Sequence, residues 1–300
     1  EEFRVFHPPK TKVMLRGMEV ERRKCPKMEE FLALEKFMHE EGLFKSSALF
    51  YLEKALILIN FFSTACSLRY SHPFWSAVCL GMFWQQLAFI GHDVGHSSVG
   101  GRENDLFYGT LFGNTLGGIS LGWWKHSHYV HHATPNDFEK DPDIQHLPVL
   151  AVDPKMLGFY SGFHETNFAL TPLAKFFVSN QVYFFYPVMT VARFNLYAQS
   201  LLWSLKNGSW LDLLTLMAFY VWFLMFAFSG PSPFMYIYVS HAVTALLHVQ
   251  ICVSHFAEQI LCEHVDWVDR QSLTTIDVDC HPALDWFHGG LQFQVIHHLF

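Results

Sequence analysis

Three histidine groups in the chain have the residue type and spacing that bind metal ions. They lie in HDVGH (92–96), HYVHH (128–132) and QVIHH (294–298), with candidate ligands at His92, His96, His128, His131, His132, His297 and His298. On a helix, positions i and i+3 or i+4 share a face, so His92 and His96 can reach one site. Adjacent helical residues diverge by about 100°, so His131 and His132 suit two metal ions side by side.

The ligand type narrows the metal. Imidazole suits iron, zinc, copper and nickel, whereas magnesium and calcium prefer oxygen ligands. The spacings do not form the Cys/His set of a structural zinc site, HExxH is absent, and the six cysteines include no CxxC pair. Seven histidines are too many for one tetrahedral ion, so we predict two ions that share about eight nitrogens. One HxxxH pair alone is more often structural; three such groups indicate a shared metal site.

Apolar helices must position these histidines. Charged residues make up 16% of the chain, against about 25% in soluble domains. Four stretches of about 20 residues are long enough to cross the hydrocarbon core of a bilayer. They are 48–68, 73–91, 210–229 and 233–254. We therefore predict an all-α polytopic membrane protein with four transmembrane helices, the alternative being four buried helices of a soluble protein.

The links between the apolar stretches predict the topology. Short links at 69–72 and 230–232 pair the spans into two antiparallel hairpins, which leaves 1–46, 92–209 and 255–300 on the opposite side. These three segments carry ten, seven and one Lys or Arg, against Arg69 alone in the links. The positive-inside rule makes the larger side cytosolic. All three histidine groups then lie on that side, in a helical cytosolic cap.

The rest of the chain gives four weaker expectations. Residues 1–46 form a cytosolic N-terminal segment with a helix from about Met28 to Glu41, and 47–300 form the membrane domain. Segments 106–124 and 176–203 are expected to be helices at the membrane surface or under the cap. If the first were a span, it would separate the histidine groups. The net charge of −7 makes nucleic acid an improbable partner.

At the three histidine groups the chain resembles the membrane fatty-acid desaturase family. Its three boxes read HDxxH, HxxHH and (H/Q)xxHH. Gln294 at the head of the third box is the pattern of the front-end branch. The strings WWKHSHYVHHATPN, DPDIQHLP (141–148) and DWFHGGLQFQ (285–294) are also similar to that branch. The resemblance covers about residues 30–300.

This resemblance implies an enzyme and its cofactors. A front-end desaturase would introduce a cis double bond into a fatty-acyl chain or a sphingolipid long-chain base. It would use O2, a di-iron centre at the cytosolic face, and electrons from cytochrome b5 and its reductase, in the endoplasmic reticulum membrane. The strings DPDIQHLP and GGLQFQ are slightly closer to the sphingolipid delta-8 branch.

The resemblance also assigns residues. The implied metal ligands are His92, His96, His128, His131, His132, His297 and His298, with His255 as the expected further histidine after the last span and His248 as a weaker candidate. Gln294 occupies a ligand-box position. Asp93 is our candidate acceptor for an imidazole N–H, or else a helix cap or solvent contact. Five aromatic residues are candidates to line an acyl tunnel: Phe83, Trp84, Phe89, Trp123 and Trp124.

The chain departs from the family pattern at several places. Tyr129 stands where Asn is common and Ile296 where Glu is common. No HPGG motif of a fused cytochrome b5 domain occurs, so the electron donor is expected to be a separate protein or a domain lost with the N-terminus. Because the chain starts without Met and stops just after the third box, we expect it to be truncated at both ends.

Other functions use related features. A lipid hydroxylase on the same scaffold differs only in product. A membrane metal transporter would place polar residues across several spans rather than at one boundary. A haem electron carrier needs two facing histidines rather than three groups.

Overall fold

The computed structural model describes residues 26–262 and 265–300. The chain divides into two compact units, residues 1–44 and 45–300. In the described part of the first unit, α3 (Pro26–Glu40) is the helix predicted near 28–41, followed by Gly42 with a φ of 73°. The rest of the predicted N-terminal segment, residues 1–25, lies outside the described residues.

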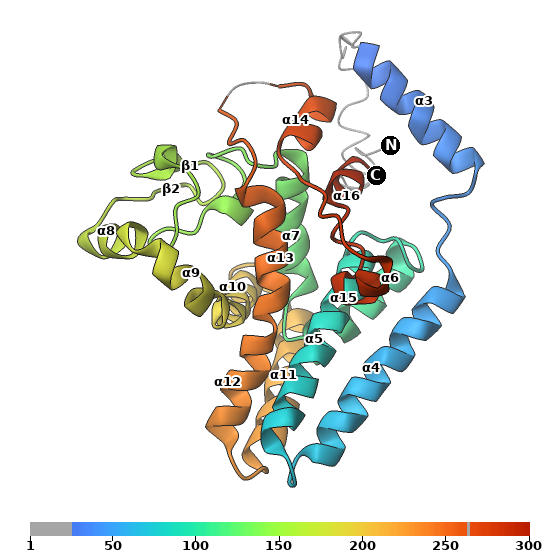
Figure 1. Cartoon of the computed structure of the whole chain (residues 1–300), viewed down its shortest axis with the longest axis vertical. Helices are drawn as coiled ribbons and strands as arrows, with labels where there is room; N and C mark the ends of the chain where they lie inside the picture. The colour runs from blue at the N-terminus through green and yellow to red at the C-terminus, as the bar shows by residue number, and fades with distance from the viewer. Residues whose placement is uncertain (1–25, 263–264) are drawn as a thin grey trace. The chain divides into compact units, whose positions relative to one another are not determined.

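The four predicted apolar helices are present in the second unit (Figure 1). Each is long and apolar enough to cross a membrane: Ala48–Leu68 (α4), Pro73–Gly95 (α5), Trp210–Phe228 (α11) and Pro233–Phe256. Prolines at the first position begin α5 and the last helix, where the missing N–H costs nothing. The last helix is divided at Thr244 into α12 (Pro233–Val243) and α13 (Ala245–Phe256).

α5 is the central helix of the apolar bundle. Its Trp84 and Leu80 are fully buried, and Trp84 contacts Phe219 and Phe223 of α11. At one end of the bundle, the Arg69 guanidinium donates to the Phe226 carbonyl and the Ser229 hydroxyl. Arg69 follows α4, and Ser229 follows α11. The two short connecting turns therefore lie together, at the bottom of the bundle in Figure 1.

The remaining elements are short and lie mainly towards the other end of the bundle (Figure 1). The segment predicted as 106–124 is α6 (Arg102–Gly109), a π-helix (Thr110–Leu116) and the start of α7 (Leu121–Ala133). The segment predicted as 176–203 falls in three helices, α8 (Pro172–Ser179), α9 (Gln181–Met189) and α10 (Ala192–Lys206). The others are 3-10 turns at Pro142–Ile144, Pro154–Met156 and Pro282–Leu284, an antiparallel pair β1 (Tyr160–Ser161) and β2 (Thr166–Asn167), and α14 (Trp267–Leu273), α15 (Asp285–His288) and α16 (Gln294–Leu299).

A buried polar network fixes the start of α7, which carries the second histidine group. Ser120 caps the helix by accepting from the Trp123 N–H. Its hydroxyl donates to Asp212 of α11 at 3.0 Å. Asn114 donates to the same carboxylate at 2.7 Å and accepts from the Leu121 N–H at 2.8 Å. Because each polar atom named here has a hydrogen-bond partner, the network anchors α7 to α11 without an unsatisfied polar atom among them.

Two glutamines from different apolar helices position the segment before the third histidine group. Gln85 of α5 donates to the Phe287 carbonyl at 2.6 Å, and Gln250 of α13 donates to the next carbonyl, of His288, at 3.1 Å. Gly289 follows with a φ of 65°, and a Cβ at this position would overlap the ring of Phe89. The DWFHGG string is therefore backbone held closely against α5 and α13, and it leads directly into α16.

Candidate metal centre

The structure brings together all eight histidines predicted as metal ligands. His92 lies in the last turn of α5, and His96 ends that helix. α7, α13 and α16 supply the others. They form two groups in which the ligand atoms lie within 4.8 Å of one another: His92, His96, His128, His132 and His297 in the first group, and His131, His255 and His298 in the second.

The Nε2 atoms of the first group face one another at uniform distances. His92 and His297 are 3.0 Å apart, as are His96 and His128, and His128 and His132. Two nitrogens that bind one ion at about 2.1 Å and at right angles to each other are separated by about 3.0 Å. The first group therefore has the spacing of nitrogens around a common cation.

The second group is smaller and more buried. The rings of His131, His255 and His298 are pairwise 4.5, 4.9 and 4.8 Å apart between centroids. The Nε2 atom of His298 is buried without any hydrogen-bond partner. An unpaired buried nitrogen is costly unless it binds something, so the donor set fits a metal ion here as well.

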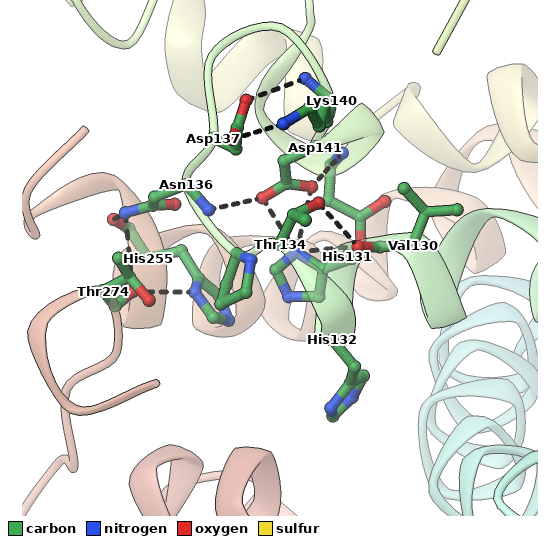
Figure 2. A network of polar contacts seen from close by, with 12 residues as sticks. Val130, His131, His132, Thr134, Asn136, Asp137, Lys140, Asp141, His255 and Thr274 are labelled. Atoms are coloured by element: carbon green, nitrogen blue, oxygen red, sulfur yellow. Dashed lines mark hydrogen bonds and ion pairs between the residues drawn. The ribbon is translucent and has the colours of Figure 1, made fainter. Parts of the chain in front are cut away.

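In each ring of the second group, the Nδ1–H donates to an acceptor outside the group. His131 Nδ1 lies 3.0 Å from both carboxylate oxygens of Asp141, and His255 Nδ1 lies 3.0 Å from the Thr274 carbonyl (Figure 2). His298 Nδ1 lies 3.0 Å from the side-chain oxygen of Gln271. Such bonds fix the tautomer so that Nε2 is free to bind metal. In Figure 2 the ring of His132 points away from Asp141, consistent with its place in the first group.

Asp141 and Gln271 are functional candidates that sequence reasoning missed. Asp141 lies in the DPDIQHLP string, and its carboxylate also accepts from the backbone N–H of Asn136. Gln271 is fully buried and donates to the His132 carbonyl at 3.0 Å. The first could have been suspected from its string, whereas no pattern marked Gln271.

The charges of His131 and Asp141 support each other. Burial alone would lower the pKa of His131, but the carboxylates of Asp141 and Asp143 and the hydrogen bond to Asp141 raise that pKa to about 9. Burial would likewise raise the pKa of Asp141, but His131 and the neighbouring backbone N–H groups lower it. Without metal, His131 and Asp141 therefore form a buried ion pair.

Five candidate ligands that lie outside the spans are held neutral. Burial, followed by nearby imidazoles, lowers the pKa of His96, His128, His132, His297 and His298 well below the ordinary value. Neutral imidazole is the form that binds metal. These rings need lose no proton before they bind.

The hydrogen bond predicted for Asp93 is not formed. Its closest approach to an imidazole is 3.7 Å, to His92 Nδ1, which is too long. The carboxylate accepts instead from the Tyr51 hydroxyl of α4, at 3.0 Å.

Trp124 stacks beside the first group, and the centroid of its ring lies 4.2 Å from that of His128.

Gln294 lies buried at the first position of α16, and its side-chain oxygen has no hydrogen-bond partner. Its role as a ligand or a tuning residue stays a prediction.

Several residues considered in the sequence analysis lie outside the two histidine groups. His248 lies outside both groups, with Nδ1 3.4 Å from the Met189 carbonyl. His241 packs among Trp84, Phe194 and Phe223. Phe83 and Trp84 are in the apolar core, and Phe89 packs on Gly289.

Comparison with known proteins agrees with this site. The family model described as fatty acid desaturase matches residues 71–300. The chain belongs to the fatty acid desaturase family. The two histidine groups lie within the residues that the family model matches, and they are compatible with a metal centre. Its four apolar helices fit a membrane protein.

The desaturase-family chain is similar to several curated relatives. It is 41% identical to "Delta(8)-fatty-acid desaturase 2" of Arabidopsis thaliana, over 79% of this chain and 55% of the relative. It is 39% identical to "Delta 8-(E)-sphingolipid desaturase" of Lachancea kluyveri, over 92% and 53%. It is 39% identical to "Acyl-lipid (9-3)-desaturase" of Borago officinalis, over 75% and 53%. The chain spans about half the length of these relatives. No solved structure matches it.

Proposed function

We propose that the protein is a front-end desaturase that introduces a cis double bond into a fatty-acyl chain or a sphingolipid long-chain base. The observation that carries this proposal is the pair of adjoining histidine groups, one of five nitrogens and one of three. The relatives named "Delta(8)-fatty-acid desaturase 2" and "Delta 8-(E)-sphingolipid desaturase" support the substrate class. The (E) in the second name denotes a trans double bond, so these names support the lipid substrate and not the cis geometry of the product.

Two iron ions are the proposed cofactor. Bound by these nitrogens, they would supply the O2 chemistry that removes hydrogen from an unactivated methylene, with electrons from cytochrome b5 and its reductase. His92, His96, His128, His132 and His297 would hold one ion, and His131, His255 and His298 the other. The Nδ1 atoms of this second set are oriented by their hydrogen-bond acceptors, Asp141, Thr274 and Gln271 respectively.

The proposed topology is two membrane hairpins, α4–α5 and α11 with α12–α13, and a helical cap on the cytosolic side of the endoplasmic reticulum membrane. The basic residues of 1–46 support that orientation. The histidines at the ends of α5 and α13 support a site at the membrane boundary.

The test combines metal content with lipid analysis. The purified protein should contain roughly two Fe per chain rather than Zn, and cells that express it should accumulate a lipid with one additional double bond. An iron-loaded protein that yields only hydroxylated lipid would identify the alternative hydroxylase. Stoichiometric zinc with no lipid product would contradict the proposal.

A further inference from the structure

Two cavities share Phe256 as a lining residue, and the smaller of them borders the second histidine group. The smaller has a volume of about 20 Å³ and is lined by His131 and His255 together with Ile144 and Cys252. That volume holds about one water molecule. The larger has a volume of about 390 Å³, within the range of ligand pockets. Phe256 lines both cavities, so it is the residue that the ligand-sized space shares with the histidine-lined space.

The walls of the larger cavity are suited to a hydrocarbon. Among the residues that the structure describes, no charged one lines it; its main lining residues are Leu150, Ala151, Val182, Phe185, Tyr186 and Phe256. The one amide, Gln181, uses its oxygen to accept from the Ala151 N–H at 3.0 Å and its nitrogen to donate to the Ala151 carbonyl at 3.1 Å. With both polar ends occupied by backbone, Gln181 presents its methylenes to the cavity.

The mouth of this cavity lies on an apolar surface. Val182 and Tyr186 of α9 are 75% and 66% exposed. The neighbouring helix α8 exposes Leu173 and Phe176, and α9 also exposes Tyr183. Contiguous exposed apolar side chains of this kind mark a membrane contact. The cavity therefore opens towards lipid rather than towards water.

We propose that the hydrocarbon tail of the lipid substrate enters through this cavity and that Phe256 is the gate between it and the second histidine group. The inference rests on the proposed function, since it names the path by which the substrate of that site arrives. Phe256 is only partly buried and its ring lies against that of His146, 5.6 Å between centroids. It can turn away without disturbing a hydrogen bond, and it determines which tails pass.

The first experiment locates the tail directly. The protein is reconstituted in nanodiscs with ceramide, or separately phosphatidylcholine, that carries a diazirine in its chain, then irradiated and mapped by mass spectrometry. We expect labels on Phe256 and on Leu150, which is buried and out of reach of a lipid at the outer surface, besides labels on exposed Leu56 and Ile59 of α4. Ala151→Trp, which fills the cavity, should remove the first set and keep the second.

The second experiment measures turnover at constant iron content. Ala151→Trp and Val182→Trp should each raise KM by about tenfold or more, with the iron per chain unchanged. Val182 is exposed, so its substitution tests the mouth even if Ala151→Trp fails to fold. Val253→Trp, at an exposed position on α13 outside the cavity, is the control and should leave KM unchanged.

The outcomes separate the two proposals. Leu150 and Phe256 labelled in a protein that desaturates no lipid would support the portal and overturn the proposed reaction. If both tryptophan variants of an active desaturase kept a normal KM and unchanged labelling, the proposal that the tail enters through this cavity would be overturned. Phe256→Ala should let the diazirine reach Cys252 in the smaller cavity. Labelling that stays outside the smaller cavity in this variant would overturn the role of Phe256 as a gate.

Discussion

His131 and His132 are neighbours in the chain, yet their imidazoles belong to different metal-binding groups. Their rings are 5.7 Å apart between centroids and inclined at 79°. His131 faces His255 and His298, whereas His132 faces His92, His96, His128 and His297. His297 and His298 divide in the same way. One turn of α7 and one turn of α16 therefore each serve both groups.

This division predicts different metal losses from adjacent substitutions. His131→Ala should empty the three-nitrogen group and reduce iron to about one ion per chain, because the five-nitrogen group stays intact. His132→Ala should instead weaken the five-nitrogen group, which retains four nitrogens. Both should abolish desaturation. Iron analysis and a lipid assay measure the outcome, with the exposed His126→Ala as control. Retained activity in His131→Ala would rule out the ligand assignment.

Gln271→Leu should weaken metal binding without removing a ligand. It deletes the acceptor for His298 Nδ1 and the donor to the His132 carbonyl. Loss of such an outer partner typically costs about 10- to 100-fold in metal affinity or activity. Competition with a chelator measures the affinity, and Ser272→Ala, at the exposed neighbouring position, is the control. An unchanged affinity would show that the His298 tautomer needs no fixing.

Metal binding by the second group should depend on pH through His131. Its pKa is raised from 6.5 to about 9, so the ion pair with Asp141 is fully stabilising below pH 6.5 and is lost as pH rises through about 9. Metal must displace this proton, so affinity should rise by up to about tenfold per pH unit between these values. Cobalt titration of metal-free protein measures it. Asp141→Asn removes the larger of the two charges that raise the pKa of His131 and should flatten this dependence; an equally steep slope would contradict it.

Gln294→His should lower activity. Gln294 is buried and neutral, its oxygen has no protein partner, and an imidazole there would add a nitrogen beside the existing groups. A lipid assay alongside iron analysis measures the effect. Much higher activity at equal iron content would contradict a tuned role for this glutamine.

Gly289→Ala should destabilise the protein by about 2 kcal/mol or more, because it combines left-handed backbone strain with a clash against Phe89. Gly290→Ala is a matched control: its φ is 92°, but a Cβ there meets nothing within 4 Å. Denaturation in detergent should show the larger loss at Gly289. Equal losses would assign the effect to backbone strain alone.

Sequence periodicity predicted the apolar helices and the two-group arrangement well. Length and apolarity located α4, α5, α11 and the last helix, because a 20-residue apolar run has few other structures. The 100° divergence of adjacent helical residues anticipated the separation of His131 from His132. The length of an apolar run and the angle between adjacent helical residues are local properties, so both could be predicted before the helices were packed together.

Contacts between distant segments were not predictable in the same way. The choice of Asp141 over Asp93 as the acceptor depends on how the loop after α7 folds back on the helix. Gln85, Gln250 and Gln271 gave no signal, because a glutamine within a helix has no pattern until its partner carbonyl is known. Phe256 likewise became a candidate only when α9 and the 150–152 loop were placed beside it.

Asn136 has a consequence for how the centre is loaded. This fully buried residue donates to the carbonyls of His255, Gln259 and Thr274, and its own N–H bonds to Asp141. It thereby joins the ends of α7, α13 and α14 through protein contacts alone. Small zinc domains unfold when their metal leaves because the metal is their main cross-link. Here the cradle is held by an amide, so we expect iron to be stripped by a chelator and restored to the same folded protein.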